Sequence, residues 1–185
     1  MGGGPIDLRE VLKAETRAAH DRLDRMSAAM PLSGNADYAA FLQAQGSARH
    51  AFERAFATTA PFGLAAPPLQ TPAVAADLSC LGQVEPSAAP AVHLADPFEA
   101  LGAAWVIAGS SLGNRAMLAA RRKAGLTTAN AFFEDRQMPA YFGRVITALQ
   151  ADFALTQAAA ILNGAHGAFA VFENAFSLVK QAKAA

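Results

Sequence analysis

Four polar residues in the first predicted helix have the types and the spacing to hold a ligand. Lys13, Arg17, His20 and Asp24 are spaced i, i+4, i+7 and i+11, so a helix over residues 8–26 places them on one face. A neutral imidazole binds metals, haem iron among them, and a carboxylate one turn later can fix its tautomer. Two cations beside it could pair with the carboxylates of an acidic ligand.

The same face has a simpler interpretation. Charged residues one turn apart are usually a solvated surface with ion pairs, and a histidine among them need have no function. The apolar residues of the stretch would pack on neighbouring helices and hold the polar face in place. They are Leu8, Val11, Leu12, Ala18, Ala19 and Leu23.

Three stretches, in chain order, resemble the bacterial haem oxygenase family, whose biliverdin-producing members include those associated with bacteriophytochromes. TRAAHDRLD at 16–24, preceded by Lys13, is similar to the family's proximal-helix motif. GSSLGN at 109–114 resembles the distal-helix signature, a Gly-x-x-x-Gly in a helix that bends over the haem. GAHGAFAVFENAF at 164–176 is more weakly similar to the C-terminal helix. Together the three cover most of the chain.

The resemblance implies both a fold and an activity. The fold would be an all-α, single-domain, haem-oxygenase-like helical bundle over residues 1–185, with residues 1–5 as a flexible N-terminus. Haem would lie between the first helix and residues 96–125. The activity would be a monooxygenase reaction that opens haem to biliverdin and releases CO and iron. Dioxygen and electrons from an external reductase or ferredoxin would be required, and a bilin-accepting phytochrome is a candidate partner.

Binding roles carry over from the family to individual residues. His20 would be the iron ligand, with Asp24 as the partner of its other ring nitrogen. Lys13 and Arg17 match basic positions that lie near the haem propionates. The motifs do not place a later propionate-binding residue, for which the candidates are Arg144 and Arg136.

The distal signature supplies the expected catalytic positions. Gly109 and Gly113 match glycines whose exposed backbone lies close over the haem and leaves room for water. Two departures concern Ala108, where many bacterial members have Glu, and Asn114, where Gly or Ala is frequent. Ser110 replaces an aspartate that organises water in mammalian-type members, so Ser110 or Asn114 could hold the water, and Asn114 could also narrow the pocket. A degenerate member that binds haem or a related tetrapyrrole without turnover is therefore the alternative.

Periodicity and turn signals predict the helices that position these motifs. A turn at 31–35 precedes a helix over 37–57, which should pack antiparallel to the first. A proline-rich loop then leads to a short helix that starts at Thr71-Pro72 and ends before Gly82. With no strand-like alternation, the chain is all-α; the later helices are expected at 128–134, 139–152 and 156–180.

The clearest helix start has Asp96 as N-cap, Pro97 at the first position and Glu99 at the third, and the stop is Gly125. The basic run at 121–123 would complement the negative end of the helix dipole.

Gly102, Gly109 and Gly113 lie inside this predicted helix, and each costs about 1 kcal/mol against alanine. Either close helix packing or a bend that admits a flat ligand would explain them.

Composition limits the remaining functions. Fifteen basic and 15 acidic residues balance, which argues against nucleic acid, and the apolar run at 100–108 is far shorter than the roughly 20 residues of a membrane span. The single Cys80 and the lack of a signal sequence predict a cytoplasmic protein. His50 and Glu53 do not complete a ferritin-like di-iron set. A helical interaction module without a ligand is the third possibility, and two other histidines are expected at the surface or in packing, His93 and His166.

Overall fold

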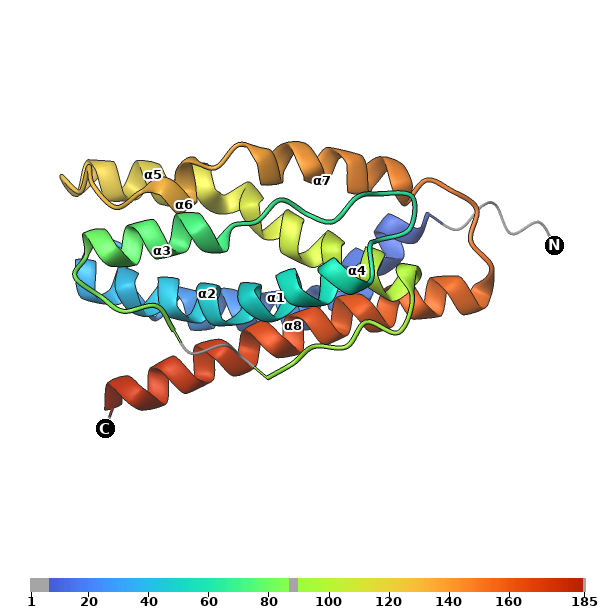
Figure 1. Cartoon of the computed structure of the whole chain (residues 1–185), viewed down its shortest axis with the longest axis horizontal. Coiled ribbons are helices and arrows are strands. Elements are labelled where there is room, and N and C mark those ends of the chain that lie inside the picture. Colours follow the sequence, from blue (N-terminus) through green and yellow to red (C-terminus); the bar gives the residue numbers. More distant parts are fainter. Residues whose placement is uncertain (1–6, 87–89, 185) are drawn as a thin grey trace.

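The computed structural model describes residues 7–86 and 90–184, and in these ranges the chain is a bundle of helices without a β-strand (Figure 1). The N-terminal residues 1–5, expected to be flexible, lie outside the described ranges. Eight α-helices and one 3₁₀ helix follow in order: α1 Leu8–Ala28, α2 Asn35–Thr58, α3 Thr71–Cys80, α4 Pro97–Gly109, η1 Ser110–Gly113, α5 Asn114–Lys123, α6 Ala131–Glu134, α7 Gln137–Ala148 and α8 Leu155–Ala184.

The first helix forms where its capping and periodicity predict. The Asp7 carboxylate accepts a hydrogen bond from the Arg9 amide at 3.0 Å, which satisfies one of the free N–H groups at the helix start. Leu8 and Leu12 are buried, as expected. Ala18 was expected to pack, but it is exposed, and Thr16 is buried with its hydroxyl donating to the Leu12 carbonyl.

The longest helix, α8, is the element on which α1, α2 and α4 pack. α1, α2 and α4 all contact it along its length (Figure 1). The second helix was expected to pack directly against the first, but α1 and α2 pack mainly on α8 and a cavity lies between them. The periodicity of each helix identified its apolar face without identifying which neighbour would cover it.

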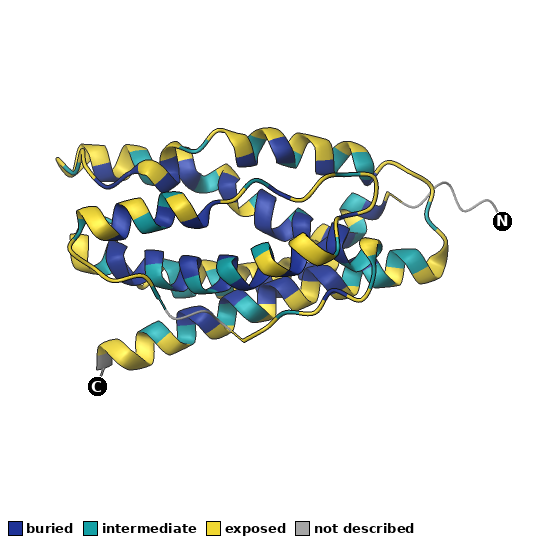
Figure 2. Ribbon diagram, viewed as in Figure 1, coloured by how far each residue is buried: buried dark blue, intermediate teal, exposed yellow. Residues whose placement is uncertain are grey.

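The backbones of α4 and α8 approach unusually closely at two glycines. A Cβ built on Gly102 would lie 1.8 Å from the Ile161 carbonyl oxygen, and one built on Gly164 would lie 1.8 Å from the Glu99 carbonyl oxygen. Close packing is therefore the reason for Gly102. Figure 2 shows the consequence, since most of α4 from Ala100 to Ala108 is buried within the bundle.

The helix predicted from Asp96 to Gly125 begins and ends as expected but is not continuous. Asp96 Oδ1 accepts from the amides of Phe98 and Glu99, each at 2.8 Å, and Gly125 adopts a left-handed φ of 80°. Between them η1 interrupts the helix at residues 110–113. The expected bend is thus a short 3₁₀ segment that begins directly after Gly109.

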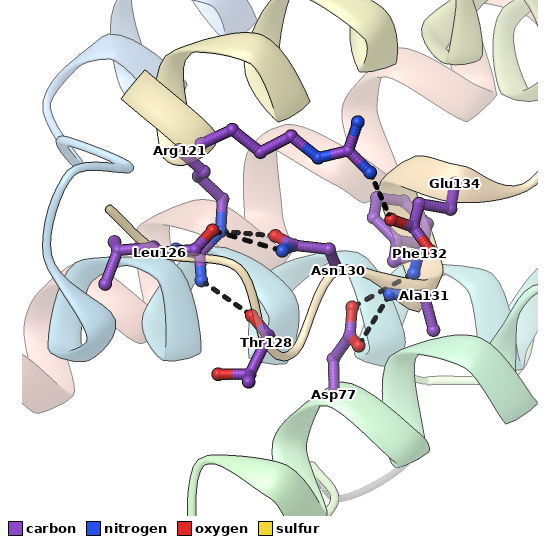
Figure 3. A network of polar contacts seen from close by, with 9 residues as sticks. Asp77, Arg121, Leu126, Thr128, Asn130, Ala131, Phe132 and Glu134 are labelled. Atoms are coloured by element: carbon purple, nitrogen blue, oxygen red, sulfur yellow. Dashed lines mark hydrogen bonds and ion pairs between the residues drawn. The ribbon is translucent and has the colours of Figure 1, made fainter. Parts of the chain in front are cut away.

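Arg121 corrects the interpretation of the basic run at 121–123. Its side chain is fully buried, with the guanidinium 3.7 Å from the centroid of the Tyr38 ring. It donates to Asn130 Oδ1 at 2.8 Å, and Asp77 accepts from the amides of residues 131 and 132 (Figure 3). Arg121 therefore holds the loop after α5 against α2, whereas its neighbours Arg122 and Lys123 are exposed.

Candidate functional site

A cavity of about 1330 Å³ lies between α1 and the bent run of α4, η1 and α5. Ligand pockets usually measure about 300–1,000 Å³, so this one can take a ligand larger than a typical small molecule. All of the residues expected to bind or act line it except Arg144. These are Lys13, Arg17, His20, Asp24, Gly109, Ser110, Gly113 and Asn114.

His20 is presented for metal binding. Its Nδ1 lies 3.2 Å from Asp24 Oδ2, one turn further along α1, so Nε2 is the nitrogen that can bind a metal. About 62% of the His20 side chain is exposed on the cavity wall, and its ring makes an edge contact with Phe169 at 6.2 Å between centroids. A core histidine would instead be enclosed by packing.

The first turns of α1 make the cavity basic at that end. Arg9, Lys13 and Arg17 all line it, and Arg9 was not predicted. Arg9 Nε is buried without a hydrogen-bond partner among the described residues, so its N–H can still donate to an anionic ligand. Lys13 Nζ already pairs with Glu10 Oε1 at 2.6 Å, so a ligand must compete for it.

The two distal glycines, Gly109 and Gly113, differ from Gly102 because a Cβ at either position would meet only a side chain and no backbone. A Cβ on Gly113 would meet only the end of the Met117 side chain at 3.5 Å, and one on Gly109 would meet the Phe142 ring at 3.3 Å. Their φ values of −60° and −75° are ordinary helical ones. Backbone strain therefore does not require glycine at either position, and what glycine provides is a cavity wall without side chains.

Ser110 and Asn114 are both turned partly into the protein. The Ser110 hydroxyl donates to the Ile107 carbonyl at 2.8 Å and accepts from Arg49 Nη2 at 2.9 Å. Asn114 is buried, and its Nδ2 donates to the Phe132 carbonyl at 3.4 Å. Neither side chain therefore has its donor hydrogens fully free to hold water in the cavity.

Several candidates lie away from this cavity. Neither Arg144 nor Arg136 lines it, and the Arg144 guanidinium lies 5.0 Å from the Tyr141 ring centroid at the surface. His50 lies 3.7 Å from Glu85, while Glu53 caps the start of α3. In the described part of the chain no cluster of His, Cys, Asp or Glu could hold a metal ion by itself.

Sequence reasoning missed the contribution of α2. Gln45 lines the cavity together with Arg49, one turn further along α2. Arg49 is 2% exposed, and its Cζ lies 5.0 Å from the Phe132 ring centroid. A polar pair spaced i, i+4 on an otherwise apolar stripe was the available signal.

These helices, with a bent helix over a large cavity, form the haem oxygenase fold. The structure is similar to that of a haem oxygenase from Neisseria meningitidis, described in its NO- and CO-bound forms with regard to oxygen activation. The TM-score is 0.75 over 94% of this chain and 92% of that chain, at 20% sequence identity. No protein-family model and no curated protein sequence matches the chain. Among the described residues no helix is long and apolar enough to span a membrane.

Proposed function

We propose that this protein is a haem oxygenase, which binds haem through His20 and opens it to biliverdin with release of CO and iron. The observation that carries the proposal is the position of the His20–Asp24 pair on the wall of a cavity whose other wall is a helix broken at Gly109–Gly113. Bound haem supplies the redox chemistry, with dioxygen and with electrons from a reductase or ferredoxin.

The residues present fit this ligand. His20 Nε2 offers a nitrogen to the iron, and Asp24 holds the imidazole in the required tautomer. The basic end of the cavity suits two propionates, and the rest of the lining is largely apolar and aromatic, as a flat tetrapyrrole requires. These apolar lining residues include Trp105, Leu112, Met117, Phe142, Phe169 and Phe172.

The wall that contains Gly109 and Gly113 would leave space beside a bound haem. Because Gly109 and Gly113 have no side chains, the wall admits small molecules and leaves room for water. The catalytic role proposed for Ser110 and Asn114 is to bind such water through the lone pairs that their protein contacts leave available.

A haem carrier without turnover is the second candidate. One observation favours it: the Ser110 hydroxyl hydrogen is engaged by the Ile107 carbonyl and is not offered to the cavity. A carrier would keep the binding wall around His20 and need no organised water.

Titration of the apo-protein with hemin separates these possibilities. A stoichiometric Soret band is expected, and biliverdin should form when reductant and dioxygen are added to the complex. Binding without biliverdin would identify a carrier, and the absence of stoichiometric binding would leave an interaction module. Hemin binding and conversion to biliverdin are measured on the same sample, so a difference in protein quality cannot explain one without the other.

A further inference from the structure

Arg49 is a buried cation at the cavity that the proposed function does not use. It lies on α2 and is 2% exposed, and its guanidinium sits beside the rings of Phe132 and Phe172, 5.0 and 5.6 Å from their centroids. A charge in such a place is expensive unless it is paired or hydrogen-bonded. Its neighbours therefore indicate what it does.

The charge of Arg49 is compensated by hydrogen bonds to neutral groups. Among the described residues no carboxylate forms an ion pair with it. Burial lowers its pKa to about 10, while Glu53 and Asp135 act from further away to raise it. Arg49 is thus still protonated at neutral pH, and its positive charge at the cavity wall is offset through space by Glu53 and Asp135 and not by a direct ion pair.

Three hydrogen bonds connect Arg49 to three separate segments. Nε donates to Gln45 Oε1 at 3.1 Å within α2, Nη1 donates to Gln70 Oε1 before α3, and Nη2 donates to Ser110 Oγ at 2.9 Å. Gln70 in turn donates to Asp135 Oδ2 at 2.9 Å. The first residue of η1 is therefore tied through one guanidinium to Gln70 before α3 and, through Gln70, to Asp135 between α6 and α7.

We propose that Arg49 is a positioning residue for the cavity wall formed by η1, Ser110–Gly113. It anchors Ser110, and with it the η1 break in the helix, and it makes this wall favourable for small anions bound within the cavity. The second part rests on the proposed function, because it concerns anions that bind to haem iron. The anchoring itself does not depend on a ligand, because all of its hydrogen bonds join residues of the chain.

The anchor is tested on the apo-protein by amide hydrogen exchange. Arg49→Met keeps much of the side-chain volume but removes the charge and the fork of donors, and Ser110→Ala removes only the link to η1. Both should speed exchange in the segment 107–114 while leaving α1 unchanged. Arg54→Met, on the exposed side of the same helix, is the matched control and should exchange as the wild type does. Wild-type exchange at 107–114 in Arg49→Met would overturn the anchoring role.

The charge is tested on the hemin complexes with azide as the probe. Arg49→Met should bind azide roughly tenfold more weakly than wild type, because removing one buried positive charge from the cavity wall weakens the attraction for an anion. Arg49→Lys keeps the charge and should recover most of the azide affinity, but it lacks the planar fork and should still show fast exchange at 107–114. Purely structural damage predicts no such separation between the two variants.

The outcomes distinguish this inference from the proposed function. Equal azide affinity in wild type and Arg49→Met would overturn the electrostatic role of Arg49 while leaving the haem site intact. If wild type binds no hemin, the proposed function fails together with the electrostatic role. The exchange experiment then still decides whether Arg49 anchors the break.

Discussion

Replacing Gly102 with alanine tests whether the glycines of the distal run have two different purposes. The new Cβ would lie 1.8 Å from the Ile161 carbonyl oxygen, a distance that must grow to at least 3.0 Å. Because the obstacle is backbone, α4 and α8 would have to separate by about 1.2 Å, enough to forfeit about half of the dispersion energy across their contact. We expect a loss of about 3–5 kcal/mol in the free energy of unfolding, which exceeds ordinary overpacking.

The matched variant is Gly113→Ala. Its backbone is helical and its Cβ meets only the flexible end of Met117, so alanine should leave stability unchanged or raise it by up to about 1 kcal/mol. Thermal unfolding of the two apo-proteins, followed by circular dichroism, should place Gly102→Ala about 6–20 °C below wild type and Gly113→Ala at or slightly above it. Similar melting temperatures for the two variants would refute the assignment of Gly102 to packing and Gly113 to the cavity wall.

Three further changes test the site and the core. His20→Ala should keep the helical circular dichroism of the apo-protein but change the Soret spectrum of its hemin complex, and an unchanged spectrum would exclude His20 as the ligand. Replacing Lys13 and Arg17 together by alanine should weaken hemin binding by about 1–2 kcal/mol, a modest amount because both side chains are exposed. An unchanged hemin affinity would show that both are ordinary surface residues without a role in binding. Burial raises the pKa of Tyr141 to about 12, and the charge of Arg144 opposes this shift. The neutral phenol therefore contributes its full stability to the folded state below pH 10, which is the pKa of tyrosine in the unfolded chain. This contribution is lost as the pH rises from 10 toward 12. Denaturant unfolding should therefore show the advantage of wild type over Tyr141→Phe shrinking by about 2 kcal/mol between pH 9 and 12, and a constant difference would show that the phenol does not titrate differently on folding.

The sequence alone determined the local structure of α1. The spacing of Lys13, Arg17, His20 and Asp24 places them together whenever residues 8–28 are helical, and the structure has them together on the cavity wall. The start of α4 was equally local, because the Asp96 carboxylate caps amides only two and three residues away. Interactions within one or two turns can be recognised without knowing the rest of the fold.

Other residues were misjudged because their partners are distant in the chain. Arg121 looks like a helix-end cation in the sequence, but Leu32 O and the Tyr38 ring, some 80 to 90 positions away, enclose it. Arg49 was not singled out from the sequence, because Gln70 and Ser110 reach it only in the folded chain. A charged residue can be buried only where such distant acceptors converge, and local patterns do not record that.

The three glycines between Pro97 and Lys123 also separate what the sequence indicates from what only the tertiary structure decides. The sequence established that Gly102, Gly109 and Gly113 needed a reason, because each weakens a helix. It left open whether that reason was packing or a cavity. Only the tertiary structure decided, by placing the α8 backbone against Gly102, and the cavity and the side chains of Phe142 and Met117 beside Gly109 and Gly113. A missing side chain carries no information about what fills its space, and that depends on which distant helix approaches.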